Sequence, residues 1–249
     1  IRCNDQKKLE IGSDQRPAVY SAIFGGYDNP PFEPTETQLE RYRFVLFSDE
    51  LKRANGWEVV KISVDHPLYC NRKIKMFPWE YLEVRHSFYI DGRVSLGENY
   101  SKLFTSLVDG DYVFAVQKHR AGGNVGSELI RCIDNGKIKR EHIQNFLDAG
   151  VDTTLQSVEC GFIYRDAHSE LVRAHASTWW NYFNSKCPRD QLWIHHASIE
   201  TGLEVKILDS SFNDCNGYLK VGSHKNKIVR ILGERLKIIK KIISTGRLL

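Results

Sequence analysis

The chain has 249 residues, a formal net charge of +4 at pH 7, 41% hydrophobic residues and 7 prolines. These values exclude a disordered, collagen-like or low-complexity protein, and the length suits one large α/β domain or two small ones. No apolar run approaches the roughly 18 residues of a membrane span, and the first residues lack the apolar stretch of a signal peptide. We therefore expect a globular, cytoplasmic protein.

The first half of the chain alternates short apolar runs with turn residues. Runs rich in branched and aromatic residues predict three strands at 18–24, 44–47 and 58–64. Helical character follows at 71–82. The next apolar run stops abruptly at an acidic turn, which predicts a fourth strand over 86–90.

The second half continues this alternation. A strand is predicted at 112–116, two short helices between 126 and 150, a strand at 158–164, and a long helix capped by Asp166 that runs to about residue 184. Strands that alternate with helices indicate an α/β fold: a Rossmann-type, mostly parallel sheet with helices on both faces. In such a sheet the ligand crevice lies at the carboxyl ends of the strands.

The six cysteines lie far apart and form neither a C-x-x-C pair nor the spacing of a structural zinc site. A chain of this length buries enough apolar surface to fold without cross-links. We expect reduced thiols, in keeping with a cytoplasmic location. The even count leaves three disulfides as the alternative.

The composition changes near Gly222, so we expect one domain over 1–224 and a separate element over 225–249. The latter carries a net charge of +7, and its isoleucines and leucines recur at helical spacing. This pattern predicts a basic amphipathic helix. Its basic face is either solvated or in contact with an anionic membrane surface, which would make the protein peripheral at the inner face of the membrane. We expect no nucleic-acid partner.

Several candidate site residues follow predicted strands. Gly25-Gly26, directly after the first strand, would let a ligand approach the backbone, although they do not form the dinucleotide-binding fingerprint. Asp91 closes an apolar strand, so it is either a ligand for a hard cation or part of an ordinary Asp-Gly turn. Arg72 and Lys75 share a helix face and form either a diphosphate clamp or a solvated surface pair.

The histidines point to different roles. His175 falls on an apolar stripe of the long helix, which predicts a core position. His195 and His196 are adjacent, so they face different sides of a helix and make a poor metal pair. His119 and Arg120 follow the fifth strand and are candidates for contact with a sugar.

Six short motifs occur in order along residues 17–225. They are YSAIFGGYD at 20–28, FSD at 47–49, NRKIK at 71–75, YIDGR at 89–93, ECGFIYR at 159–165 and RDQ at 189–191. The series resembles a family of glycosyltransferase-like domains with plant members linked to mucilage polysaccharide synthesis and relatives in bacteria and large algal viruses. The resemblance implies a GT-A fold, a Rossmann-like domain that binds a nucleotide sugar.

Such domains usually hold Mn²⁺ or Mg²⁺ through an acidic D-x-D element. In this chain Tyr89-Ile90-Asp91 occupies that element, so only its last acid is present. Related enzymes often add a histidine near the C-terminal end of the domain, and His224 is placed to do so. The resemblance thus implies Asp91 and His224 as metal ligands, completed by pyrophosphate oxygens and water. The alternative for His224 is an exposed loop position.

The resemblance also implies a donor site and a catalytic base. The residues that would contact the nucleoside and the phosphates are Phe24, Gly25, Gly26, Tyr27, Asp49, Arg72 and Lys75. Asp190 is the first candidate for a general base in an inverting mechanism, and Glu159 is the second. The alternatives make Asp190 a helix N-cap and Glu159 an acceptor ligand or a salt-bridge partner of Arg165. A retaining enzyme would use both carboxylates for positioning.

Taken together, these features predict a metal-assisted glycosyltransferase in polysaccharide biosynthesis. It would move a sugar from a nucleotide diphosphate sugar, UDP-linked, to a glycan or lipid-linked acceptor. The alternative is a catalytically inactive module whose residues 225–249 bind a membrane surface or a polyanion. A nucleotidyltransferase is disfavoured because no glycine-rich loop with a suitable lysine follows the first strand.

Overall fold

The computed structural model describes residue 14 and residues 16–209 and 217–222. The helix expected at 225–249 and the candidate metal ligand His224 lie outside the described residues. Within the described part, no helix combines the length and apolar character that crossing a membrane requires.

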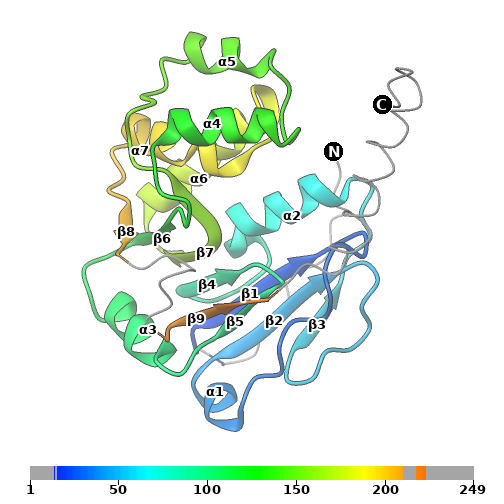
Figure 1. Cartoon of the computed structure of the whole chain (residues 1–249). Helices are drawn as coiled ribbons and strands as arrows, with labels where there is room; N and C mark the ends of the chain where they lie inside the picture. The colour runs from blue at the N-terminus through cyan, green and yellow to red at the C-terminus, as the bar shows by residue number, and fades with distance from the viewer. Residues whose placement is uncertain (1–13, 15, 210–216, 223–249) are drawn as a thin grey trace, which may run out of the picture.

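A seven-stranded sheet forms the centre of the molecule, with the strand order β3-β2-β1-β4-β7-β6-β8 (Figure 1). Its strands are β1 (Ala18–Ile23), β2 (Arg43–Ser48), β3 (Glu58–Lys61), β4 (His86–Ile90), β6 (Phe114–Lys118), β7 (Val158–Asp166) and β8 (Lys206–Leu208). Neighbouring strands pair in parallel except at β7, which runs antiparallel to both β4 and β6. The predicted α/β class with a mostly parallel sheet is confirmed.

Helices and a second, two-stranded sheet surround the central sheet. They are α1 (Glu36–Arg41), α2 (Pro67–Met76), α3 (Tyr100–Val108), α4 (Val125–Asp134), α5 (His142–Asp148), α6 (Glu170–Ser185), α7 (Ile194–Thr201), the 3₁₀ turns η1 (Pro78–Glu80) and η2 (Asp190–Leu192), and the pair β5 (Val94–Leu96) and β9 (Leu219–Val221).

Two hydrophobic cores lie on the two faces of the central sheet. One contains buried side chains of α2, α4, α6 and α7, and the other contains those of α3, β5 and β9. Figure 1 shows α2, α4 and α6 on one side of the strands and α1 and α3 on the other. Apolar residues on both faces explain why every residue of β1 is buried. Helices on both faces, as predicted, are confirmed.

The β6–β7 pairing contains an irregularity next to the carboxyl end of β6. Val116 pairs with Ile163, but the next residue, Gln117, pairs with Glu159, so β7 has three extra residues between these two pairs. Successive side chains of a strand point to opposite faces of the sheet. An odd number of extra residues therefore reverses which face the even-numbered side chains point to. Accordingly, Val158 and Cys160 belong to one core, whereas Phe162 and Tyr164 belong to the other.

Several boundaries differ from those predicted. The helix expected at 71–82 begins at Pro67, which favours a first-turn position, and ends at Met76. The strand expected at 112–116 covers 114–118. The long helix is capped by Ser169, whose side chain accepts from the Val172 N–H, and not by Asp166, which ends β7.

The described cysteines are buried thiols: Cys70, Cys132, Cys160 and Cys187. With four of the six cysteines reduced, the alternative of three disulfides is wrong. Burial raises the pKa of the Cys132 thiol to about 11 and that of Cys187 to about 12. These thiols therefore stay protonated at neutral pH and contribute as small apolar groups.

Candidate active site

A cavity of about 810 Å³ opens where β1, β4 and β6 have their carboxyl ends and β7 has its amino end. Its walls also include α2, the turn between β6 and α4, and the segment that leads into η2. The sequence-predicted residues that line it are Phe24, Gly25, Tyr27, Arg72, Lys75, Asp91, Glu159 and Asp190. Gly26 and Asp49 are not part of this lining. The crevice is thus where the parallel strands predict it.

Arg72 and Lys75 of α2 share the carboxylate of Asp190 in η2. Nζ of Lys75 donates to Oδ2 of Asp190 at 2.9 Å, and Nε of Arg72 forms an ion pair with the same oxygen at 2.9 Å. Nζ of Lys75 also lies 3.9 Å from Oδ1 of Asp91 and 4.7 Å from the centre of the Tyr89 ring. We name these five residues the Asp190 cluster. Since Lys75 is only 2% exposed, the alternative of a solvated surface pair is wrong.

Neighbouring cations decide the protonation of Asp190. Burial raises the pKa of this carboxyl, but the charges of Arg72, Lys75 and Arg189 together outweigh burial and hold the pKa well below its usual range. A carboxylate so stabilised is a weak base, which argues against Asp190 as the proton acceptor. The N-cap alternative also fails, because Arg189 occupies the N-cap position of η2 and no side chain caps that turn.

Buried groups hold the backbone on both sides of this ion pair. The Tyr20 hydroxyl donates to the Lys75 carbonyl at 3.0 Å and accepts from Nη1 of the fully buried Arg165 at 3.1 Å. Nε1 of Trp179 donates to the Asp190 carbonyl at 2.7 Å. Trp179 is therefore a fully buried core residue that supports the site.

Asp91 follows β4 and faces the cavity with a side chain that is 32% exposed. Its Oδ1 accepts from the Tyr89 hydroxyl at 2.9 Å. The described residues contain no cluster of three His, Cys, Asp or Glu side chains able to hold a metal ion. Mg²⁺ is commonly held by one or two carboxylates together with substrate phosphates and water. Asp91 therefore fits a divalent cation that enters together with a phosphorylated ligand.

The two glycines after β1 form a left-handed turn, with φ of 63° at Gly25 and 60° at Gly26. The Gly25 N–H donates to both oxygens of Asp49, at 3.1 and 3.0 Å. Asp49 thus fixes the turn through its carboxylate, and its expected contact with a nucleoside stays a prediction. The turn carries Tyr27, which lines the cavity and is 62% exposed.

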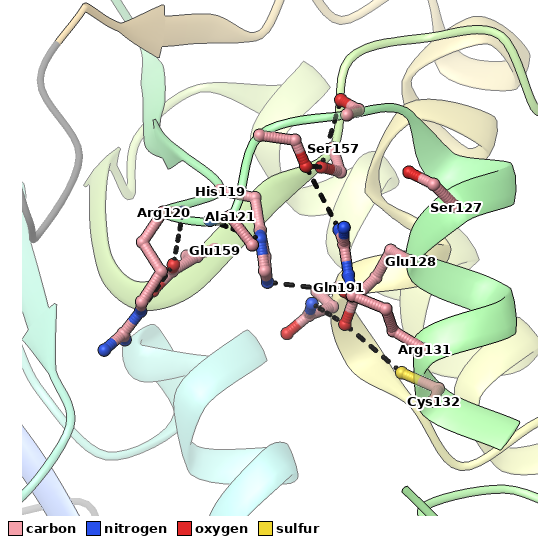
Figure 2. A network of polar contacts seen from close by, with 12 residues as sticks. His119, Arg120, Ala121, Ser127, Glu128, Arg131, Cys132, Ser157, Glu159 and Gln191 are labelled. Carbon is pink, nitrogen blue, oxygen red and sulfur yellow. Dashed lines mark hydrogen bonds and ion pairs between the residues drawn. The ribbon is translucent and has the colours of Figure 1, made fainter. Parts of the chain in front are cut away.

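Glu159 is buried at the amino end of β7 and is bound by one residue at three points. Its Oε1 accepts from the Arg120 N–H at 2.6 Å and from Nε at 2.8 Å, and its Oε2 accepts from Nη2 at 2.7 Å (Figure 2). The expected salt-bridge partner, Arg165, lies elsewhere in the core. The bidentate pair attaches the turn after β6 to β7, and this turn places His119 and Arg120 in the cavity wall. Their contact with a sugar stays a prediction.

A further buried carboxylate, Glu128 of α4, was not predicted from the sequence. It is 3% exposed, and Figure 2 shows side chains converging on it from the β6–α4 turn, from α4 itself and from η2. Its contacts are Arg131 Nε at 2.9 Å, Cys132 Sγ at 3.2 Å, Gln191 Nε2 at 2.5 Å, His119 Nε2 at 3.4 Å and Arg189 Nη2 at 3.6 Å. We name these six residues the Glu128 cluster.

Three further histidines of the described part of the chain, His175, His195 and His196, make structural contacts. His175 is fully buried, as predicted, and its Nε2 lies 3.1 Å from the Ile194 carbonyl. His195 bonds the Gln156 carbonyl at 2.8 Å, while His196 packs edge-on against Tyr182. The adjacent pair therefore uses its rings for separate contacts.

No family model matches the sequence, and no curated protein matches it. The resemblance to the mucilage-linked family therefore stays a prediction. Solved structures with a similar chain path include glycosyltransferases.

The WbbM bifunctional glycosyltransferase has a TM-score of 0.46 at 10% identity, over 80% of this chain and 40% of that chain. Mouse xyloside xylosyltransferase 1 has a TM-score of 0.45 at 8% identity, over 77% and 84% of the two chains. The 4-diphosphocytidyl-2C-methyl-D-erythritol synthase of Anaerococcus prevotii has a TM-score of 0.44 at 10% identity, over 80% and 91%. This chain thus spans less than half of the WbbM chain. A shared chain path does not define a shared reaction.

Proposed function

We propose that this protein is a glycosyltransferase that moves a sugar from a UDP-linked donor to a glycan or lipid-linked acceptor. One observation carries the proposal: Arg72 and Lys75 lie side by side on a single carboxylate oxygen, in the same cavity as Asp91. Such a pair of cations suits a diphosphate. The resemblance of the six ordered sequence motifs to glycosyltransferase-like domains supports sugar transfer as the reaction.

The Asp190 cluster would act on the leaving group. When the bond between the sugar and the diphosphate breaks, negative charge develops on the diphosphate. Arg72 and Lys75 are oriented before the donor arrives, because Asp190 holds both, so they stabilise this charge without further reorganisation. We therefore assign Asp190 a positioning role in place of the base role expected from the sequence.

Asp91, together with His224, would hold a divalent ion between the protein and the donor phosphates. A bound Mn²⁺ or Mg²⁺ would supply Lewis-acid neutralisation of the diphosphate. Within the chain, the Tyr89 hydroxyl keeps the Asp91 carboxylate in place through its bond to Oδ1. The hydroxyl stays protonated at neutral pH, because burial raises the pKa of Tyr89 well above its usual range.

The nucleoside would bind at the turn after β1. Phe24, Gly25 and Tyr27 line that end of the cavity, and the exposed Tyr27 ring offers a surface for a base. Asp49 would act indirectly, since its carboxylate is committed to the Gly25 N–H. The acceptor would enter on the side of His119, Arg120, Glu159 and Arg189.

The deciding experiment is a screen of nucleotide sugars with Mn²⁺ or Mg²⁺ that follows nucleoside diphosphate release with and without acceptors. We expect one productive donor, and a loss of about 100-fold or more in turnover for Asp91→Asn and for His224→Ala. The matched control is Asp65→Asn, an exposed aspartate outside the cavity lining, which should leave turnover unchanged.

Two results would contradict the proposal. Release of pyrophosphate from a sugar phosphate and a nucleoside triphosphate would identify a nucleotidyltransferase. Salt-sensitive binding to anionic vesicles without any affinity for UDP would favour the inactive module, because screening by salt weakens surface electrostatics.

A further inference from the structure

Glu128 stands behind the cavity wall but contacts three residues that form it. His119, Arg189 and Gln191 all line the cavity, and each places a nitrogen near an oxygen of Glu128. The three come from two separate segments of the chain, the turn after β6 and residues 189–191, which begin η2. A single carboxylate on α4 thus connects both segments.

The contacts use both oxygens of Glu128. Oε1 accepts hydrogen bonds from Cys132 and Gln191 and lies 3.6 Å from Nη2 of Arg189. Oε2 accepts a hydrogen bond from Arg131 and lies 3.4 Å from Nε2 of His119. The Gln191 amide makes two hydrogen bonds: its Nε2 donates to Glu128, and its Oε1 accepts from Nη2 of Arg189 at 2.6 Å. A carboxylate with this many donors fixes the direction of each of them.

Contacts at both ring nitrogens fix the orientation of the His119 side chain. The Ala121 N–H donates to Nδ1 at 3.2 Å, so the proton of the neutral ring is on Nε2 and points toward Oε2 of Glu128. Arg131 also donates to the Gly122 carbonyl at 3.1 Å, which holds the same turn to α4. The turn cannot shift without breaking bonds to the Glu128 cluster.

We propose that Glu128 is a positioning residue that fixes His119, Arg189 and Gln191 in the wall where the acceptor binds. That this wall binds the acceptor rests on the proposed function, whereas the positioning itself does not. Glu128 touches no ligand, since it lies outside the cavity lining.

The first test reads the electrostatics of the wall without any substrate. Burial lowers the pKa of His119, while Glu128 and Glu159 raise it and Arg131 and Arg120 lower it. In Glu128→Gln the charge facing Nε2 is lost, so the His119 pKa measured by NMR titration should fall further below its value in the unmodified protein. The matched control is Asp166→Asn, which removes another buried, arginine-paired carboxylate at the opposite end of β7.

The second test is kinetic. We expect Glu128→Gln to raise the KM for the acceptor roughly tenfold, the equivalent of one lost charged hydrogen bond, with the KM for the donor unchanged. Glu128→Asp keeps the charge and should recover part of this loss. It also replaces Glu128→Gln if that variant does not fold. Asp166→Asn should leave both KM values unchanged.

An unchanged His119 pKa, or equal acceptor KM values in the unmodified protein and Glu128→Gln, would overturn the proposal. If the unmodified protein transfers no sugar while the His119 pKa still falls in Glu128→Gln, the positioning stands and the glycosyltransferase function fails. The two proposals can thus be separated.

Discussion

Two of the buried carboxylates at the candidate site, Asp190 in the cavity lining and Glu128 outside it, differ in how they bind their neighbours. Asp190 faces two cations through one oxygen, whereas Glu128 spreads its contacts over both oxygens and includes neutral donors. The clusters meet at η2, where Asp190 belongs to one and its neighbour Gln191 to the other. Ammonium and guanidinium groups carry several N–H donors each, so the cations of the Asp190 cluster can also bind a ligand. The Glu128 cluster instead fixes side-chain positions.

The largest effect should follow from Asp190→Asn, which leaves the buried Lys75 and the partly buried Arg72 without their counter-charge. We expect a loss of about 3–5 kcal/mol in the free energy of unfolding, measured by denaturant titration. The control is Glu80→Gln, which breaks an ion pair with Lys73 at the surface and should cost less than about 1 kcal/mol. Equal losses in the two variants would mean that burial does not distinguish the Asp190 cluster.

His175 offers a buried titratable group outside both clusters. Burial lowers its pKa to about 4 from 6.5 in an unfolded chain. The unfolded state therefore binds more protons between these values, and stability is lost as the pH falls from about 6.5 to about 4. The loss should reach about 3 kcal/mol. It should be absent in His175→Gln, with denaturant titrations at several pH values as the measurement; an identical pH profile in the variant would contradict this.

Glu128→Gln should cost less than Asp190→Asn, about 2 kcal/mol in the same denaturant titration. The reason is that Arg131 is 33% exposed and can turn to water, and that the neutral donors can still bond the amide oxygen. A loss as large as that of Asp190→Asn would show that the Glu128 cluster depends on charge and not on the number of its bonds.

The smallest effect should come from Cys132→Ser. The thiol donates to Oε1 of Glu128, and a hydroxyl can donate to the same oxygen, so the change should stay below about 1 kcal/mol in thermal or denaturant unfolding. A larger loss would mean that the apolar character of the sulfur matters more than its hydrogen bond.

The sequence predicts most of the central sheet. The runs at β1, β2, β4 and β7 are apolar, bounded by turn residues and buried on both faces, so local pattern and tertiary structure agree. The small pair β5 and β9 could not be predicted, because each strand has three residues and is stabilised by a partner far away in the sequence. The helix α3 was missed although its buried residues recur at helical spacing.

Only part of the candidate site could likewise be predicted from the sequence. Residues at strand ends, such as Asp91 and Glu159, could be placed from topology alone. The pairing of Asp190 with α2 joins residues 115 positions apart, and the contact between Glu128 and Gln191 joins residues 63 positions apart. No local pattern carries such information. One signal could have been used: Glu128 lies in the first turn of an amphipathic helix on its buried side, an unusual position for an acid.

The three extra residues in β7 make the two halves of this strand independent of one another. In the half with Ile163 and Tyr164, successive side chains must point alternately into the two hydrophobic cores. In the half with Val158 and Glu159, the alternation is set separately, by the pairing with the end of β6. Homologous chains could therefore vary the length of this insertion by two residues and keep Glu159 on the same side. A change of one residue would turn its carboxylate away from Arg120 and detach the turn that carries His119.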